Sequence, residues 1–102
     1  MPLDFAILSN DGTPNQTVPL SMELHDELMS NARELKLYRI LKFHDYFEDV
    51  DTSPIELAGL QQEILSLQRT ASTRQALRFL LELYRLTELA VGQGQTIYAI
   101  AD

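Results

Sequence analysis

Residues 3–8 read LDFAIL, and this stretch decides the fold. Leu3, Phe5 and Ile7 alternate along it, which is the two-residue period of a β-strand. Residues 96–101, TIYAIA, form a similar run near the other end of the sequence. Neither run has another strongly apolar strand to pair with. We therefore expect both to meet in one small sheet.

A turn and a short second strand follow the first. Residues 10–15, NDGTPN, combine the residue types that dominate turns. Residues 17–20, TVPL, can then return beside the first strand as a hairpin. Pro19 has no backbone N–H to donate to a ladder, so this strand is expected at a sheet edge or to break off there.

Helical signals occupy the middle of the chain. Ser21 is typical of an N-cap, and the acids of the next turns, Glu23, Asp26 and Glu27, suit the start of a helix. This helix is expected to run to about Lys36. Helical spacing resumes over residues 38–50, with one side formed by Ile40, Phe43, Phe47 and Val50. The sequence leaves open whether residues 21–50 are one bent helix or two.

Ser53, Pro54 and Glu56 mark the clearest boundary. A serine cap, a proline at the first helical position and a glutamate three residues after the cap form a capping box. The helix that they begin continues through Leu67.

A second capping box, Ser72 with Gln75, precedes the last helix. This helix is expected over about residues 73–91 and to end at Gly92 and Gly94. It is apolar around most of its circumference, which is typical of a central helix. The fold class is therefore α+β: a small antiparallel sheet, built from the N-terminal hairpin and the C-terminal strand, packed by three to four helices, with the strand order open.

Length and composition restrict the class of protein. The 102 residues fit a single domain, 1–102, and the absence of cysteine excludes disulfides and thiolate zinc sites. The first residues lack the basic segment of a signal peptide, and no apolar run is long enough to span a membrane. We expect a cytoplasmic protein.

The net charge of −7 is uneven along the chain. Residues 1–68 hold 12 acids and 4 bases, whereas residues 69–102 hold 3 acids and 4 arginines. Such an acidic chain repels the phosphate backbone, so nucleic acid is not an expected partner.

Candidate metal and catalytic groups are few. The spacing of acids after Asp49 does not match a calcium-binding EF-hand loop. Two His-Asp dipeptides, His25-Asp26 and His44-Asp45, are shared with HD-type phosphohydrolases, but on a helix His44 and Asp45 would point in different directions. We expect His44 at the edge of the core and His25 on a helix surface.

No nucleophile or phosphate-binding loop is present in a catalytic pattern. We therefore expect no enzyme, catalytic residue, metal or cofactor. A small metal-dependent hydrolase that uses His25, His44 and Asp45 stays as the alternative from another class.

The segment 44–51, HDYFEDVD, carries the densest charge, and residues 44–56 hold five acids and no base. On a helix through 38–50, Tyr38, Lys42, Asp45 and Asp49 would share one face. Two interpretations stay open: a solvated acidic face, or a docking face for a partner rich in arginine or lysine. The predicted partner-binding residues are Tyr38, Asp45, Tyr46, Glu48, Asp49, Asp51 and Glu56.

The succession of LDFAILSNDG, VPLSMELHDEL, the acidic HDYFEDVD, leucine-rich helices and a closing strand resembles the small acidic immunity proteins of bacterial polymorphic toxins, including contact-dependent inhibition systems. The resemblance implies a cytosolic protein that binds one cognate, basic toxin domain and blocks it, without catalytic residues of its own. A regulatory or adaptor module with the same acidic face is the alternative among binding proteins. The oligomeric state stays open.

Overall fold

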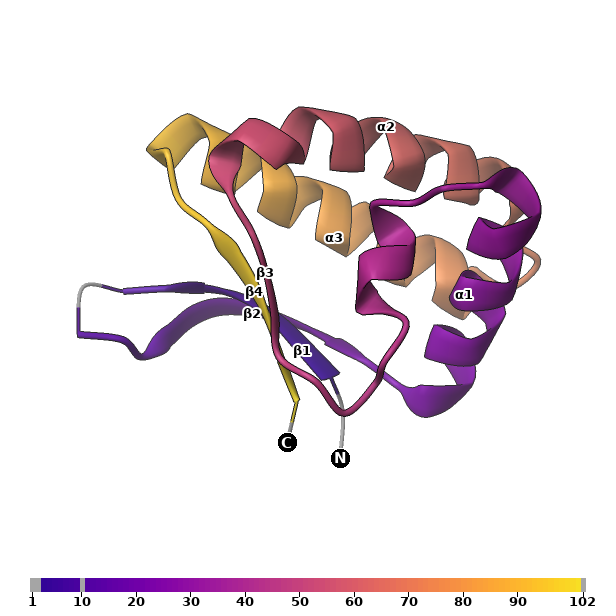
Figure 1. The fold of residues 1–102 in the computed structure, drawn as a ribbon, viewed down its shortest axis with the longest axis horizontal. Coiled ribbons are helices and arrows are strands. Elements are labelled where there is room, and N and C mark those ends of the chain that lie inside the picture. The colour runs from indigo at the N-terminus through magenta and orange to yellow at the C-terminus, as the bar shows by residue number, and fades with distance from the viewer. Residues whose placement is uncertain (1–2, 10, 102) are drawn as a thin grey trace.

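The computed structural model describes residues 3–9 and 11–101, so Met1, Pro2, Asp102 and Asn10 of the predicted turn lie outside the described residues. The elements are β1 (Leu3–Leu8), β2 (Pro14–Leu20), α1 (Met22–Leu35), the short 3₁₀ helix η1 (Ile40–Phe43), β3 (Val50–Thr52), α2 (Pro54–Thr70), α3 (Arg74–Gln93) and β4 (Ile97–Ala101). Strands and helices are segregated, and the predicted α+β class is confirmed (Figure 1).

The four strands form one antiparallel sheet in the order β2-β1-β4-β3. Phe5 lies opposite Ala99 and Ile7 opposite Ile97, so the predicted pairing of the two distant strands is confirmed. Pro19 lies in β2, an edge strand, where its missing N–H costs no ladder bond. The sequence did not predict β3, which adds a fourth strand beside β4.

The β1–β2 turn is held by a carboxylate. Asp11 Oδ1 accepts hydrogen bonds from the hydroxyls of Ser9 and Thr13 and from the backbone N–H of Thr13. These bonds, with that from Ser9 the largest cause, lower the pKa of Asp11 to about 2. Gly12 follows with a φ of 84°, in the left-handed region that glycine adopts without strain.

All three α-helices lie on one side of the sheet (Figure 1). The core forms between them and the sheet face that carries Phe5. The Phe5 ring meets Phe43 of η1 and Phe79 of α3 edge-to-face, with centroids 5.0 and 5.8 Å apart. One strand thus packs against two elements that are distant in sequence.

The predicted helix over residues 38–50 is wrong. Only η1 is helical there, followed by an irregular segment and β3. Glu63 of α2 accepts the backbone N–H of Ile40 at 2.9 Å, and Asp45 Oδ1 accepts that of Phe47 at 2.9 Å. An α-helix over residues 38–50 would bond the Phe47 amide to the carbonyl of Phe43, so the bond to Asp45 favours a turn over a continuous helix. Phe47, predicted on the buried side, is 70% exposed, and Val50 belongs to β3.

The helix caps mostly follow the predictions. Ser21 caps α1, and Ser53 with Glu56 forms the predicted capping box of α2. The cap of α3 is Thr73, one residue after the predicted Ser72; its Oγ1 accepts the N–H of Ala76. The helix also runs past Gly92 and ends at the left-handed Gly94.

Helix α3 packs against α1, α2 and strands β1 and β2, as expected of a central helix, but one side of it is exposed. Its buried face holds residues such as Phe79, Leu83 and Leu86, whereas Leu77 and Leu81 are exposed.

Candidate protein-binding surface

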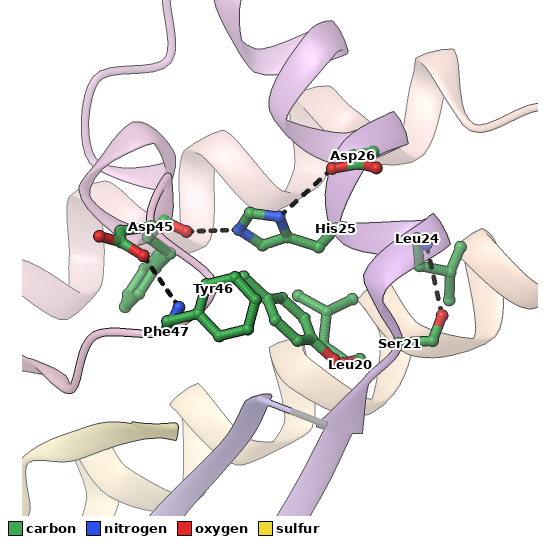
Figure 2. Close-up of polar contacts among 9 residues, drawn as sticks. Leu20, Ser21, Leu24, His25, Asp26, Asp45, Tyr46 and Phe47 are labelled. Atoms are coloured by element: carbon green, nitrogen blue, oxygen red, sulfur yellow. Dashed lines mark hydrogen bonds and ion pairs between the residues drawn. The ribbon is translucent and has the colours of Figure 1, made fainter. Parts of the chain in front are cut away.

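The 44–49 loop, HDYFED, joins η1 to β3 and contains most of the predicted binding residues. Tyr46 fixes it to the fold. Its ring is only 8% exposed, and its hydroxyl donates a hydrogen bond of 2.7 Å to the carbonyl of Leu20, at the junction of β2 and α1 (Figure 2). Predicted beside a docking face, Tyr46 instead belongs to the core and anchors the loop.

Two of the carboxylates in this loop shape the backbone. Asp45 Oδ1 accepts the N–H of Phe47 at 2.9 Å, closing a tight turn (Figure 2). Asp49 Oδ1 accepts the N–H of Ala101 at 2.8 Å, so the other end of the loop is tied to β4. Both acids therefore hold the loop in one conformation.

The centre of the loop projects outward. Phe47 and Glu48 are exposed, and Asp51 of β3 is exposed just beyond. The Phe47 ring rests edge-to-face on Tyr46, with centroids 5.6 Å apart (Figure 2). A large apolar ring on a fixed loop, next to free carboxylates, has the composition of a binding hot spot with a polar rim.

The two remaining predicted residues lie apart from the loop. Tyr38 is 71% exposed but precedes η1, at the opposite end of that helix from Asp45. The Glu56 carboxylate accepts the N–H of Ser53 at 3.1 Å and pairs with Lys42 at 3.2 Å. The Ser53 bond and then Lys42 lower the pKa of Glu56, and the lysine offsets its charge.

The expected positions of the two histidines are reversed. His25 is 4% exposed; its Nε2 lies 2.6 Å from the carbonyl of Phe43, and its ring packs edge-to-face on Tyr46 (Figure 2). His44 is exposed, with Nδ1 2.9 Å from the carbonyl of Leu41. The two errors have different causes. His44 was expected on a helix but lies in the irregular loop. His25 lies on a helix, as expected, but on the side of α1 that faces this loop.

A hollow of about 330 Å³ lies between the start of α1 and the loop. Its lining brings together the two His-Asp dipeptides with Met22, Tyr46 and Phe47. Sequence reasoning missed Met22 and Asp26 as neighbours of the loop. The cap at Ser21 predicts that α1 starts at Met22, and on this helix Met22 and Asp26, four residues apart, share one face. No pattern near them shows that this face lies beside the loop.

This hollow does not have the donor arrangement of a metal site. Nε2 of His25 is held by Phe43, and Nδ1 of His44 by Leu41. Among the described residues, no group of three or more histidine, aspartate or glutamate side chains is placed to hold one ion. The hydrolase alternative therefore gains no support from the arrangement of His25, His44 and Asp45.

Comparison of the chain with protein-family models, curated proteins and solved structures finds no match. Within residues 3–9 and 11–101, none of the helices combines the length and apolar character that crossing a bilayer requires.

Proposed function

We propose that this chain is a protein-binding inhibitor, of the kind that immunity proteins provide against a cognate bacterial toxin. The 44–49 loop and Asp51 bind a basic toxin domain in the cytosol and block it. The proposal assigns no catalysis, cofactor or nucleic-acid binding to the chain.

The observation that carries the proposal is the exposed ring of Phe47 on a loop that is tied to the rest of the fold at two points and closed by one internal hydrogen bond. Tyr46, Asp45 and Asp49 each make a hydrogen bond that fixes the loop. A preorganised loop loses little conformational freedom on binding, so more of its contact energy contributes to affinity. At an interface, an exposed aromatic side chain of this kind fills a partner's pocket and becomes buried.

Charge supports a basic partner. Residues 43–68 contain six acids and no lysine or arginine. Asp26, which the structure places beside the loop, adds an exposed carboxylate. A surface of one sign attracts a partner of the opposite sign, raises the association rate and repels partners of the same sign.

The test is to look for a toxin domain encoded immediately upstream of this chain's gene and, where one is present, to produce it. Co-expression of the wild-type chain should restore growth to cells that make the toxin domain, and the two purified proteins should form a stable complex. Absence of such a neighbouring gene, or a toxin domain that the wild-type chain neither binds nor neutralises, refutes the immunity function.

Two double variants locate the interface. Glu48→Gln with Asp51→Asn removes two exposed acids at the proposed surface, and Glu34→Gln with Glu88→Gln removes two exposed acids from α1 and α3. Both change the net charge equally. We expect the first pair to slow association by roughly tenfold at low salt, with a weaker salt dependence, and the control pair to change it far less. Equal effects would show that only net charge matters and that the interface lies elsewhere.

A further inference from the structure

Tyr98 and Ile100 of β4 lie on the side of the sheet that faces away from the helices. They alternate with Ile97 and Ala99, which are buried on the core side. Consecutive residues of a strand point to opposite faces, and all three α-helices lie on one side (Figure 1). We call the other side the open sheet face; its apolar residues include Leu8, Tyr98 and Ile100.

A hollow of about 280 Å³ is present on this face beside β3. Leu8, Tyr98 and Ile100 contribute its apolar lining, and Asp49 and Asp51 contribute carboxylates on one side. Asp51 lies opposite Tyr98 in the β3–β4 register, and Asp49 is fixed by the N–H of the last β4 residue. The hollow thus sits directly beside the 44–49 loop.

The charges around the hollow are of one sign. None of the four strands contains a lysine or an arginine, whereas β1 holds Asp4 and β3 holds Asp51. All eight basic residues of the chain lie between positions 33 and 42 or between 69 and 85, outside the sheet. An apolar hollow with an acidic border selects a partner segment that combines an apolar side chain with basic ones.

We propose that the open sheet face is a second docking site for a basic protein partner, adjoining the first and sharing Asp49 and Asp51 with it. An apolar or aromatic side chain of the partner enters the hollow between Tyr98 and Ile100, while its lysine or arginine side chains meet Asp49 and Asp51. The inference rests on the proposed function for the identity of the partner. A second copy of this chain fits the site poorly, because it would bring one acidic face against another.

The binding chemistry can be tested with defined peptides. The probe is Ac-Arg-Phe-Arg-NH₂, compared with Ac-Glu-Phe-Glu-NH₂ and Ac-Arg-Gly-Arg-NH₂, in nitrogen-15 NMR titrations of the full chain at low salt. We expect the first peptide to shift the amide signals of Val50, Tyr98 and Ile100. The charge-reversed peptide and the one without the aromatic ring should shift them far less. Shifts confined to other parts of the molecule, or equal shifts with all three peptides, overturn the proposal.

A matched pair of substitutions controls for general effects. Ile100→Thr shortens the apolar lining but keeps a β-branched residue in the strand. It should weaken binding of Ac-Arg-Phe-Arg-NH₂ by more than roughly fourfold, the factor for one buried methylene, because it removes one carbon and replaces a second with a hydroxyl. Ile55→Thr, at an exposed position of α2, should leave binding unchanged. If Ile100→Thr does not fold, Tyr98→Ser takes its place; unchanged binding in the folded variant overturns the site.

Other outcomes separate this inference from the proposed function. A concentration-dependent dimer that Ile100→Thr abolishes assigns the face to a second copy and overturns the inference. Peptide binding at the hollow, with a wild-type chain that fails to bind the toxin domain, refutes the immunity function alone. A toxin domain that binds wild type and Ile100→Thr equally well refutes the second docking site alone.

Discussion

Replacing Tyr46 with phenylalanine tests whether the 44–49 loop is held by the core. The ring is retained, so packing against His25 and Phe47 is preserved, and only the hydroxyl is lost. That hydroxyl donates 2.7 Å to the carbonyl of Leu20, a residue that is itself buried. The substitution therefore removes one hydrogen bond without opening a large cavity.

The expected cost follows from burial. A typical intramolecular hydrogen bond contributes about 0.5–1.5 kcal/mol, and a buried acceptor that loses its donor costs about 1–3 kcal/mol. We expect Tyr46→Phe to lower the free energy of unfolding by about 1–3 kcal/mol. For a domain of this size that corresponds to a fall in Tm of about 4–12 °C. A total stability of about 5–15 kcal/mol would leave the variant folded.

Urea unfolding followed by circular dichroism measures this difference, and Tyr38→Phe is the matched control because Tyr38 is largely exposed. Amide exchange adds a local readout: the N–H of Phe47, bound to Asp45, should exchange faster in Tyr46→Phe. A loss below about 0.5 kcal/mol, equal to that of Tyr38→Phe, with unchanged exchange at Phe47, would refute the idea that Tyr46 fixes the loop.

Three further predictions concern the fold. The hydroxyl partners of Asp11 lower its pKa to about 2, so the ionised carboxylate stabilises the fold fully above the ordinary pKa of 3.8, and this stabilisation is lost as the pH falls from 3.8 toward 2. In Asp11→Asn, the Tm should therefore fall less between pH 3.8 and pH 2 than it does in the wild type. An identical dependence of the Tm on pH in the two proteins would contradict this role of Asp11. Deleting residues 95–102 removes β4 from between β1 and β3 and should unfold the domain; a truncated chain that keeps the wild-type Tm would show that β4 is dispensable. Glu63→Ala leaves the Ile40 amide without its acceptor and should cost about 1–3 kcal/mol in urea unfolding, whereas an exposed control, Glu88→Ala, should cost under about 0.5 kcal/mol; equal losses would contradict a specific role for Glu63.

Local patterns were sufficient to predict most elements of the fold. Leu3, Phe5 and Ile7 alternate because one side of β1 is buried, and this period predicted both the strand and its pairing with β4. The caps at Ser21 and Ser53 fixed two helix starts to the residue, because capping depends on neighbours only a few positions away.

The errors arose where distant residues decide the local structure. The apolar spacing over residues 38–50 is compatible with a helix, but the carbonyl of Phe43, which a helix would bond to the Phe47 amide, lies 2.6 Å from Nε2 of His25, far away in the sequence. β3 has only three residues and is recognisable only beside β4. The burial of His25 depends on the carbonyl of Phe43, which no pattern around His25 reveals.

The sequence predicted which segment carries the acids of the candidate site, but not which of its side chains are exposed. The density of acids around positions 45–51 marked the segment, since charge is read directly from the sequence. Which of its residues face solvent depended on the backbone path: Phe47 is exposed and Tyr46 buried, the reverse of what a helix through this segment implies. Asp49 and Asp51 lie next to the open sheet face only because β3 pairs with β4.

The central place of β4 in the sheet has a consequence for the order of folding. During synthesis, β1, β2 and β3 leave the ribosome well before residues 97–101. Until β4 inserts, β1 and β3 each present an open edge, and such edges recruit other chains. The contacts that complete the sheet also join positions more than ninety residues apart, such as Leu3 and Ala101, and contacts of such long range slow folding. A newly made chain is therefore most prone to aggregate before β4 has emerged and paired with β1 and β3.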